Sequence, residues 1–282
     1  MNNLLTAILC SSALALLMKG FSSENGSRYG LLLGNYITCT LLSLITMNDV
    51  SILTSLSPFT VITGVVGGFL FLFGLLSIQT SIPVNGAALT SAFSKLGIIV
   101  SIAFSILFFR ETPNPLHIPG ILLAVIALPL VNHTEDKTQN RHGALILLLL
   151  TMLAGGLADT IGKFFTVYGD PAQEKAYLFI LFLTAALLTL LLSIIEHRSS
   201  GTAIRLNELL AGIAVGIPNY FTSLFQLRAL AVLPAAFVYT CCSGGTVVMV
   251  MLGSRILFQE RYNRIQKIGI ALILAALASL CL

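Results

Sequence analysis

Long apolar runs, separated by short polar connections, constrain this chain more than any other feature. They lie at residues 3–18, 29–47, 58–78, 84–109, 116–131, 143–165, 175–195, 208–230, 234–257 and 265–282. Most approach the roughly 20 residues that a helix needs to cross a bilayer. Hydrocarbon offers backbone groups no hydrogen-bond partner, so each run must satisfy its own backbone as a helix. The runs predict an all-α integral membrane protein with ten transmembrane helices.

Composition narrows the classes of function. Hydrophobic residues make up 56% of the chain and charged residues 9%, against roughly 25% charged residues in a soluble domain. The net charge of +4 is scattered, which argues against a nucleic-acid partner. The five cysteines all lie inside apolar runs without a CxxC spacing, so we expect core residues and neither a metal nor a cofactor. The first run lacks the positive start of a secretion signal and is expected to stay as a span.

An internal repeat divides the chain. Residues 105–128 align without a gap with residues 254–277, and nine of the 24 positions are identical. Apolar bias alone would match leucine and alanine, but the alignment also pairs Glu111 with Glu260 and Gly120 with Gly269. A weaker match sets Lys19 opposite Lys163. We therefore predict two five-helix repeats, at residues 1–135 and 136–282.

An odd number of spans in each repeat has a geometric consequence. The second copy must enter the bilayer from the opposite side, so the two repeats are predicted to be inverted. Many secondary transporters have this arrangement, with a site near the membrane midplane. Glu111 and Glu260 follow the fourth span of each repeat. There they either anchor the hairpin beside the N-terminus of the next helix or take part in gating.

The same hairpins carry a family resemblance. In each repeat a Phe-x-Glu pattern is followed nine residues later by glycine, at Phe109, Glu111 and Gly120 and again at Phe258, Glu260 and Gly269. With its ten expected spans, the chain resembles the EamA type of the drug/metabolite transporter superfamily. The resemblance implies a metabolite carrier, often an exporter, with a cavity lined by spans 1, 3, 4, 6, 8 and 9. The proline often found midway along span 4 of such proteins is absent, so cavity details do not carry over.

The orientation in the membrane is predicted differently by two criteria. The resemblance implies that both termini are cytoplasmic. The positive-inside rule places loops rich in lysine and arginine in the cytoplasm. Ten cations fall on one side and four on the other, namely Arg110, Lys163, Lys175 and Arg228. The ten lie outside if the termini are inside, so the two criteria disagree; we follow the resemblance.

Charges deep in a span mark candidate functional residues, because a lysine or aspartate there costs about 2.5–3.5 kcal/mol on insertion scales. Lys95 lies near the middle of the run 84–109, and either lines a cavity or pairs with Asp159 to hold helices together. Asp159 and Lys163 are four residues apart, so they share a helix face. They form either a local stabilising pair or a cavity pair that exchanges partners with substrate or a proton.

Polar residues in two later spans complete the predicted substrate site. Asn219 and Tyr220 follow Pro218, which frees backbone groups that could bind a ligand, and Tyr239 is a similar candidate in the ninth span. The alternative is that asparagine joins helices within the membrane. Histidines lie only at span edges, which argues against a metal cluster.

These features predict a non-enzymatic secondary transporter in the cell membrane, surrounded by lipid bilayer and present as a monomer or homodimer. Its substrate is a small organic metabolite, amino-acid-like or anionic because a lysine lies at the midplane, and it is exported by alternating access. Proton coupling could run through Asp159. Two alternatives are a flippase for a lipid-linked carrier and a non-transporting partner subunit. A membrane enzyme would need acids or histidines gathered on one face, and here they are spread over both.

Overall fold

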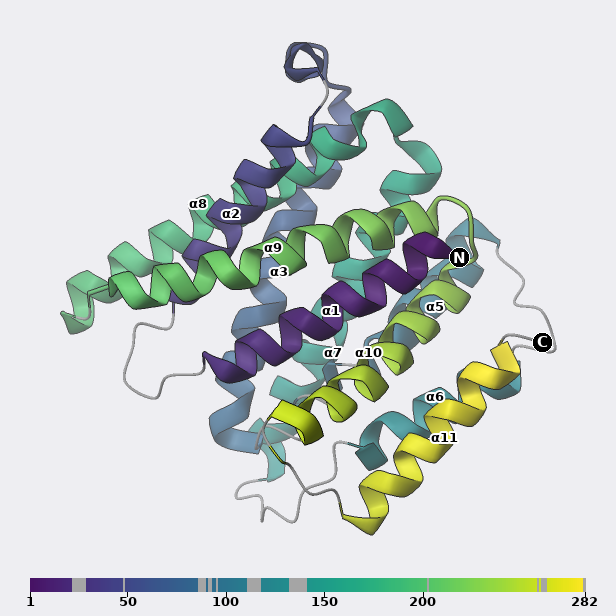
Figure 1. The fold of residues 1–282 in the computed structure, drawn as a ribbon. Helices are drawn as coiled ribbons and strands as arrows, with labels where there is room; N and C mark the ends of the chain where they lie inside the picture. The colour runs from purple at the N-terminus through teal and green to yellow at the C-terminus, as the bar shows by residue number, and fades with distance from the viewer. Residues whose placement is uncertain are drawn as a thin grey trace. The chain divides into compact units, whose positions relative to one another are not determined.

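The computed structural model describes residues 1–21, 29–47, 49–85, 90, 93–94, 96–110, 118–131, 141–201, 203–257, 259 and 263–280. Within these ranges the regular structure is helical, without strands (Figure 1). The helices are α1 (Asn2–Gly20), α2 (Gly30–Ile45), η1 (Val50–Thr54), α3 (Pro58–Asn85), α5 (Ile98–Phe109), α6 (Ile118–Val131), α7 (Arg141–Tyr168), η3 (Pro171–Gln173), α8 (Glu174–Ser200), α9 (Leu206–Leu230), α10 (Ala235–Leu257) and α11 (Arg264–Leu280). The all-α prediction is confirmed.

Among the described residues, five helices are long and apolar enough to cross a membrane. They occupy Pro58–Ser81, Leu145–Tyr168, Pro171–Ser199, Leu206–Leu230 and Ala235–Leu257. Others, such as α2 with 16 residues and α6 with 14, are apolar but shorter. At 1.5 Å per residue such helices fall short of the ~30 Å hydrocarbon core. Ten spans therefore remain a prediction, although each apolar run overlaps one of the described helices.

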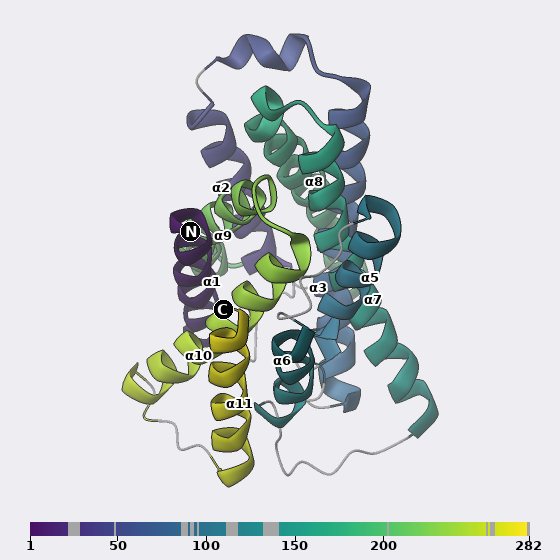
Figure 2. The ribbon, with the colours of Figure 1, turned by 90° about the vertical axis from the view of Figure 1, so that its right-hand side faces the viewer.

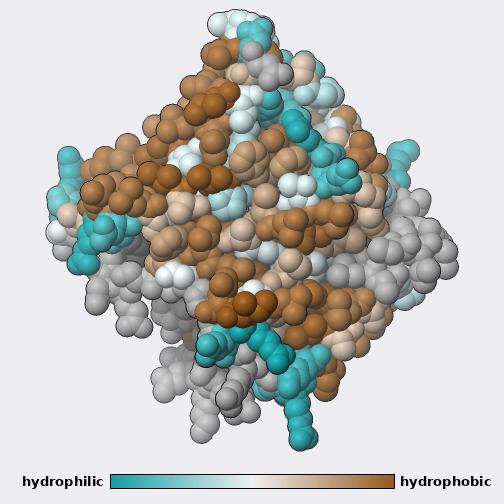
Figure 3. Space-filling view, in the orientation of Figure 1, coloured by the Kyte–Doolittle hydropathy of each residue, from teal (hydrophilic) through white to brown (hydrophobic). Residues whose placement is uncertain are grey.

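Large apolar side chains are exposed along most helices. Leu107 on α5 is 73% exposed and Ile256 on α10 is 77% exposed. Figure 3 shows hydrophobic residues over much of the visible surface, with hydrophilic residues near helix ends. A soluble protein rarely exposes contiguous apolar patches on this scale. The exposed surface is that of a membrane-embedded protein, whose solvent is lipid.

The chain forms two compact units, and each takes helices from both predicted repeats. Unit 1 comprises residues 1–72 and 164–228, and unit 2 comprises residues 73–163 and 229–282. The boundaries fall inside α3, α7 and α9. Spatial units and sequence repeats are different properties, so the division at residues 135 and 136 stays a prediction about the sequence.

Unit 1 is built around α2 and α8, which lie side by side (Figures 1 and 2). Tyr36 of α2 and Phe182 of α8 are fully buried, and their ring centroids are 6.4 Å apart. Phe71 of α3 meets Phe182 edge to face, with centroids 6.1 Å apart. Such aromatic contacts add to the apolar packing of the three helices.

Short connections at one end of unit 1 are held by side chains. The Gln173 side chain accepts a hydrogen bond from the backbone N–H of Ser57 (3.1 Å) and donates one to the carbonyl of Ser55 (3.4 Å). Ser57 in turn accepts a bond from the backbone N–H of Thr60 (3.1 Å), which caps the start of α3. The carboxylates of Asp49 and Asp170 cap η1 and η3 in the same way.

Unit 2 is built around α6 and α11, which pack along each other (Figures 1 and 2). Its core contains Ala127 of α6, Met251 of α10 and Ile273 of α11, with Val248 and Ile270 against them. Ala127 and Ile273 are fully buried in this contact. In the absence of a hydrophobic driving force between helices in lipid, such packing supplies much of the association energy.

The hairpins that carry the repeat share backbone detail as well as sequence. Arg110 follows α5 with φ 52°, and Gln259, its counterpart 149 residues later, has φ 54°. Positive φ is uncommon for residues other than glycine. The identical residues Ser105 and Ser254 are both buried. Corresponding residues after the two helices therefore share a positive φ.

Candidate functional site

The predicted site residues fall into three groups. Lys95, Glu111 and Glu260 lie outside the described residues. Asp159, Lys163 and Tyr239 belong to unit 2, while Asn219 and Tyr220 belong to unit 1. Each unit therefore has its own set of buried polar groups, built by different helices.

Lys163 has a structural partner in unit 2. Its side chain is 5% exposed, and Nζ donates a hydrogen bond of 3.1 Å to the backbone carbonyl of Leu230, the last residue of α9. The final carbonyls of a helix have no partner within the helix, and its C-terminus favours positive charge. Lys163 thus caps α9 from α7, which offsets part of the cost of burying an ammonium group.

Asp159 and Tyr239 meet one helical turn from Lys163. The buried Tyr239 hydroxyl of α10 donates a hydrogen bond to the backbone carbonyl of Asp159 on α7. The Asp159 side chain is half-buried. Unit 2 therefore brings the Tyr239 phenol to the backbone of Asp159, one helical turn from Lys163, where α7 and α10 come together.

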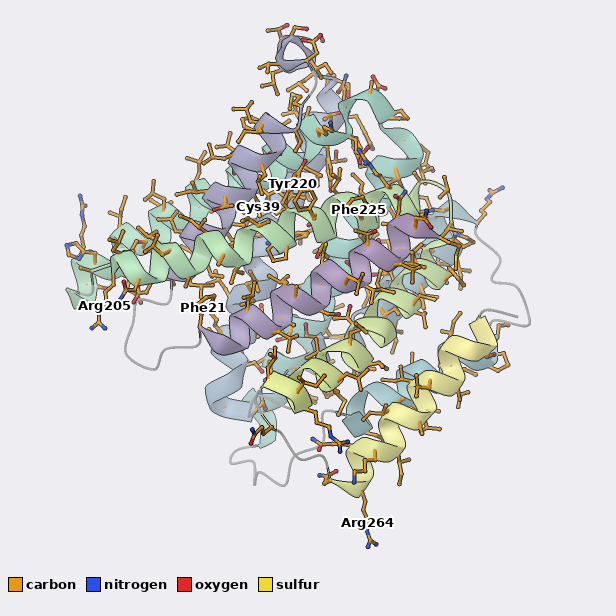
Figure 4. The ribbon with its side chains drawn as sticks, in the orientation of Figure 1. Phe21, Cys39, Arg205, Tyr220, Phe225 and Arg264 are labelled. Atoms are coloured by element: carbon orange, nitrogen blue, oxygen red, sulfur yellow. The ribbon has the colours of Figure 1, made fainter. Side chains whose placement is uncertain are left out.

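Asn219 of α9 contacts α2 in unit 1. Its amide Nδ2 donates to Asn35 Oδ1 at 3.0 Å, and Asn35 is 3% exposed. The Cys39 thiol lies one turn further along α2 and donates to the Gly216 carbonyl at 3.2 Å. Figure 4 shows Cys39 and Tyr220 on these neighbouring helices. These bonds connect α9 to α2, in agreement with the helix-joining alternative for Asn219.

Tyr220 also bonds to α2, at the end of that helix. Its hydroxyl pairs with the Thr46 hydroxyl, and Lys175 Nζ donates to the Thr46 carbonyl. Next to Lys175 along α8, Glu174 Oε1 accepts from Arg228 Nε at 2.8 Å. The three helices α2, α8 and α9 are therefore connected at one end by a polar network, which sequence reasoning did not find because its members lie in three distant segments.

Glycines bring helices of unit 1 close together. A Cβ at Gly212 would lie 2.4 Å from the Leu31 carbonyl oxygen, and one at Gly216 would lie 2.6 Å from Thr38 Cβ. A Cβ at Gly68 would lie 2.4 Å from the Leu181 carbonyl oxygen. Gly68 belongs to an adjacent pair with Gly67, whereas Gly212 and Gly216 stand singly in the sequence.

These glycines reveal a second set of corresponding positions. Gly64 and Gly68 of α3 recur 148 residues later as Gly212 and Gly216 of α9. The helices that they contact correspond as well, because α8 residues lie 146 positions after their α2 counterparts, as Thr184 does after Thr38. Gly68 packs on Thr184 as Gly216 packs on Thr38. The glycine spacing itself was the signal that could have found this match.

The titratable groups limit the chemistry of these sites. In the part of the chain that the structure describes, no group of three or more His, Cys, Asp or Glu side chains could hold a metal ion. The polar groups above instead bond to backbone carbonyls, to an asparagine amide, to a hydroxyl and to a carboxylate. Such groups are suited to hydrogen bonding with a solute or a neighbouring helix.

Comparison with known proteins gives the fold without a function. No family model matches the chain. An uncharacterized protein of Haemophilus influenzae is 24% identical over 293 residues, covering 98% of this chain and 96% of that protein. A solved structure, described only as a crystal structure of a protein, has a TM-score of 0.76 at 14% identity and covers 99% of this chain and 95% of its own. At that identity the likeness shows a shared fold alone.

Proposed function

We propose that this protein is a secondary transporter that moves a small organic metabolite across the cell membrane by alternating access between two inverted repeats. The support lies in matched details of the two halves. The α5–α6 and α10–α11 hairpins share nine identities and the positive φ of Arg110 and Gln259. Inverted repeats of this kind are typical of secondary transporters.

The observation that carries the proposal is the pairing of helix contacts. Gly64 and Gly68 of α3 pack on α8, and Gly212 and Gly216 of α9 pack on α2 at corresponding positions. Unrelated helices would not repeat both the glycines and their partners. A duplicated five-helix module accounts for this pattern, and its odd helix number inverts the second copy. The resemblance to the EamA type of transporter is consistent with it.

We place the substrate contacts at Asp159, Lys163 and Tyr239, together with Lys95. Lysine side chains favour a solute with a carboxylate or another anionic group, as in an amino acid. Asp159 is the group that could couple transport to a proton. The hydrogen bonds of Asn219 and Tyr220 to α2 favour a helix-joining role for these two residues.

The experiment is a thermal-shift screen of anionic and zwitterionic metabolites on purified protein, followed by uptake of each positive compound into proteoliposomes. We expect Lys95→Ala, Asp159→Asn and Tyr239→Phe to lose the ligand-induced shift and the uptake. Tyr168→Phe is the matched control, because Tyr168 is an exposed tyrosine of α7 whose contacts with Phe59 and Phe164 are made by its ring. Full uptake by both Lys95→Ala and Asp159→Asn would contradict the proposed site. Copurifying lipid that produces the shift would favour a flippase.

Orientation needs its own test, because the resemblance and the charge count predict opposite answers. Four cations were assigned to the side of the membrane with fewer lysines and arginines, and three of them have partners within the protein: Lys163 with Leu230, Lys175 with Thr46, and Arg228 with Glu174. Fusions of green fluorescent protein and of alkaline phosphatase to the C-terminus separate the two predictions. Fluorescence with inactive phosphatase would support the cytoplasmic termini that we propose.

A further inference from the structure

Unit 1 contains two helix crossings with the same glycine packing but different side chains beside it. We call the contact of α2 with α9 around Gly212 and Gly216 the polar crossing. The corresponding contact of α8 with α3 around Gly64 and Gly68 is the apolar crossing. The apolar crossing shows what close packing alone requires, so it serves as an internal control for the polar one.

In the polar crossing, hydrogen bonds follow α2 along most of its length. Asn35 accepts from Asn219 at 3.0 Å, Cys39 donates to the Gly216 carbonyl at 3.2 Å, and Thr46 pairs with Tyr220. Sliding α9 along α2 by even part of a turn would break all three. In hydrocarbon the released groups find no water, so these bonds hold one register of the two helices.

In the apolar crossing the corresponding side chains cannot form such bonds. The counterparts of Asn35, Cys39 and Thr46 in α8 are Leu181, Ala185 and Leu192, and those of Asn219 and Tyr220 in α3 are Phe71 and Leu72. Leu181 and Ala185 are buried like the residues that they replace. Van der Waals contacts across a glycine surface have no donor–acceptor geometry, so these side chains do not tie the two helices to one register by hydrogen bonds.

The start of α3 is fixed by hydrogen bonds, whereas the face of α3 that packs on α8 is apolar. Gln173, just before α8, bonds to the backbone of Ser55 and Ser57, and Ser57 caps α3 through Thr60. Fixed at one end and apolar along the side, α3 has the properties of an element that pivots. Shear and hinge movements of packed helices are established modes of conformational change.

We propose that α3 pivots on α8 about the Gln173–Ser57 contact during the transport cycle, while α9 is locked to α2 by the Asn35–Asn219, Cys39–Gly216 and Thr46–Tyr220 bonds. This inference rests on the proposed function. Asn35 and Asn219 are accordingly positioning residues. The two halves, though copies of one module, move unequally.

The test measures distance distributions by double electron–electron resonance. A spin-labelled noncanonical amino acid leaves the five native cysteines in place. Leu41 with Ile217 reports on the polar crossing, and the corresponding residues Leu187 with Phe69 report on the apolar one. All four side chains are exposed, at 53%, 46%, 57% and 54% respectively. None of the four is among the atoms nearest to Gly64, Gly68, Gly212 or Gly216, so the labels avoid the glycine contacts of both crossings.

We expect a single narrow distribution for Leu41/Ile217, and a distribution about twofold broader, or one with a second peak, for Leu187/Phe69. Distributions of equal width for the two pairs, or a broader distribution for Leu41/Ile217 than for Leu187/Phe69, would overturn the proposal. Exchanging the side chains adds a causal test. Leu181→Asn with Phe71→Asn should narrow the Leu187/Phe69 distribution, and Asn35→Leu with Asn219→Phe should broaden the Leu41/Ile217 distribution.

The result of the distance measurements can be interpreted separately from the result of the ligand screen and the uptake assay. The distributions are measured without a substrate, so the wild-type comparison decides the inference even if an exchange variant fails to fold. Suppose that the two distance distributions differ in width and that no metabolite raises the melting temperature of the protein. This result would support the pivot of α3 and contradict the proposed transport function. Uptake of a metabolite together with two equally narrow distributions would support the transport function and contradict the pivot.

Discussion

The two crossings of unit 1 separate two determinants of helix packing in a membrane. At both, glycines four residues apart bring backbones into contact, as Gly68 does on α8 and Gly216 on α2. The polar crossing adds hydrogen bonds between side chains of the two helices, at Asn35 and at Thr46, whereas the described counterparts Leu181 and Leu192 at the apolar crossing carry no hydrogen-bonding side-chain group. Small residues therefore set how closely helices approach, and polar residues set the register at which they stay.

The largest effect is expected from the glycines, and it should be equal at the two crossings. A methyl group at Gly212 or at Gly68 would lie 2.4 Å from a backbone oxygen. Gly212→Ala and Gly68→Ala should each lower the free energy of unfolding by about 1–3 kcal/mol, the usual cost of overpacking. Gly155→Ala is the control, since its Cβ would meet its nearest neighbour at an ordinary 3.5 Å. Unfolding in detergent measures all three, and a loss at one crossing only would break the correspondence.

A smaller effect should distinguish the crossings from each other. Asn35→Leu introduces the residue found at its α8 counterpart and leaves Asn219 without its 3.0 Å partner. We expect a loss of about 0.6–2 kcal/mol in unfolding free energy, the range for interhelical polar contacts in membranes. Leu181→Met, a change of similar volume at the apolar crossing, should be nearly neutral. Asn35→Leu with wild-type stability would show that the hydrogen bonds do not hold the register.

The ion pair at the end of the polar network should contribute less. Arg228 and Glu174 are 2.8 Å apart, but their side chains are 37% and 22% exposed. Solvent screening limits such a pair to about 1 kcal/mol or less. Glu174→Gln should therefore lower stability slightly at low salt and not at 1 M salt. The double variant Glu174→Arg with Arg228→Glu should restore it, whereas failure of this exchange would point to a role for the residues beyond their charge.

The smallest effect is expected outside both crossings, at Asp49. Hydrogen bonds from the Ser51 side chain and backbone hold the pKa of the exposed Asp49 carboxyl below its usual value. A lowered folded-state pKa stabilises η1 above the ordinary carboxylate pKa, and this contribution is lost as pH falls through the lowered one. Carbon-13 NMR of labelled aspartate should show the low pKa, and Ser51→Ala should raise it. Neither protonation of Asp49 nor Ser51→Ala should alter the loss of unfolding free energy that Gly212→Ala causes.

The hairpin repeat was predictable because identical residues occur at corresponding positions of the two hairpins. Glu, Asn and Gly recur at one spacing in 105–128 and 254–277, and the burial of Ser105 and Ser254 agrees with the match. The crossings were not found, since Asn35 and Leu181 occupy corresponding positions without chemical likeness. For Asn219 and Tyr220, sequence reasoning placed polar groups inside a span. It could not decide between a ligand and a neighbouring helix as their partner.

Sequence by itself determined that this chain is helical and apolar, because lipid forces each apolar run to satisfy its own backbone. It also determined that Glu, Asn and Gly recur at one spacing in 105–128 and 254–277, because residue identities can be compared without a structure. Only the tertiary structure decided which glycines touch, that Lys163 caps α9, and that Asn35 meets Asn219. These contacts join residues up to 184 positions apart. No local pattern specifies such a partner, because helix faces select each other by shape once the chain has folded.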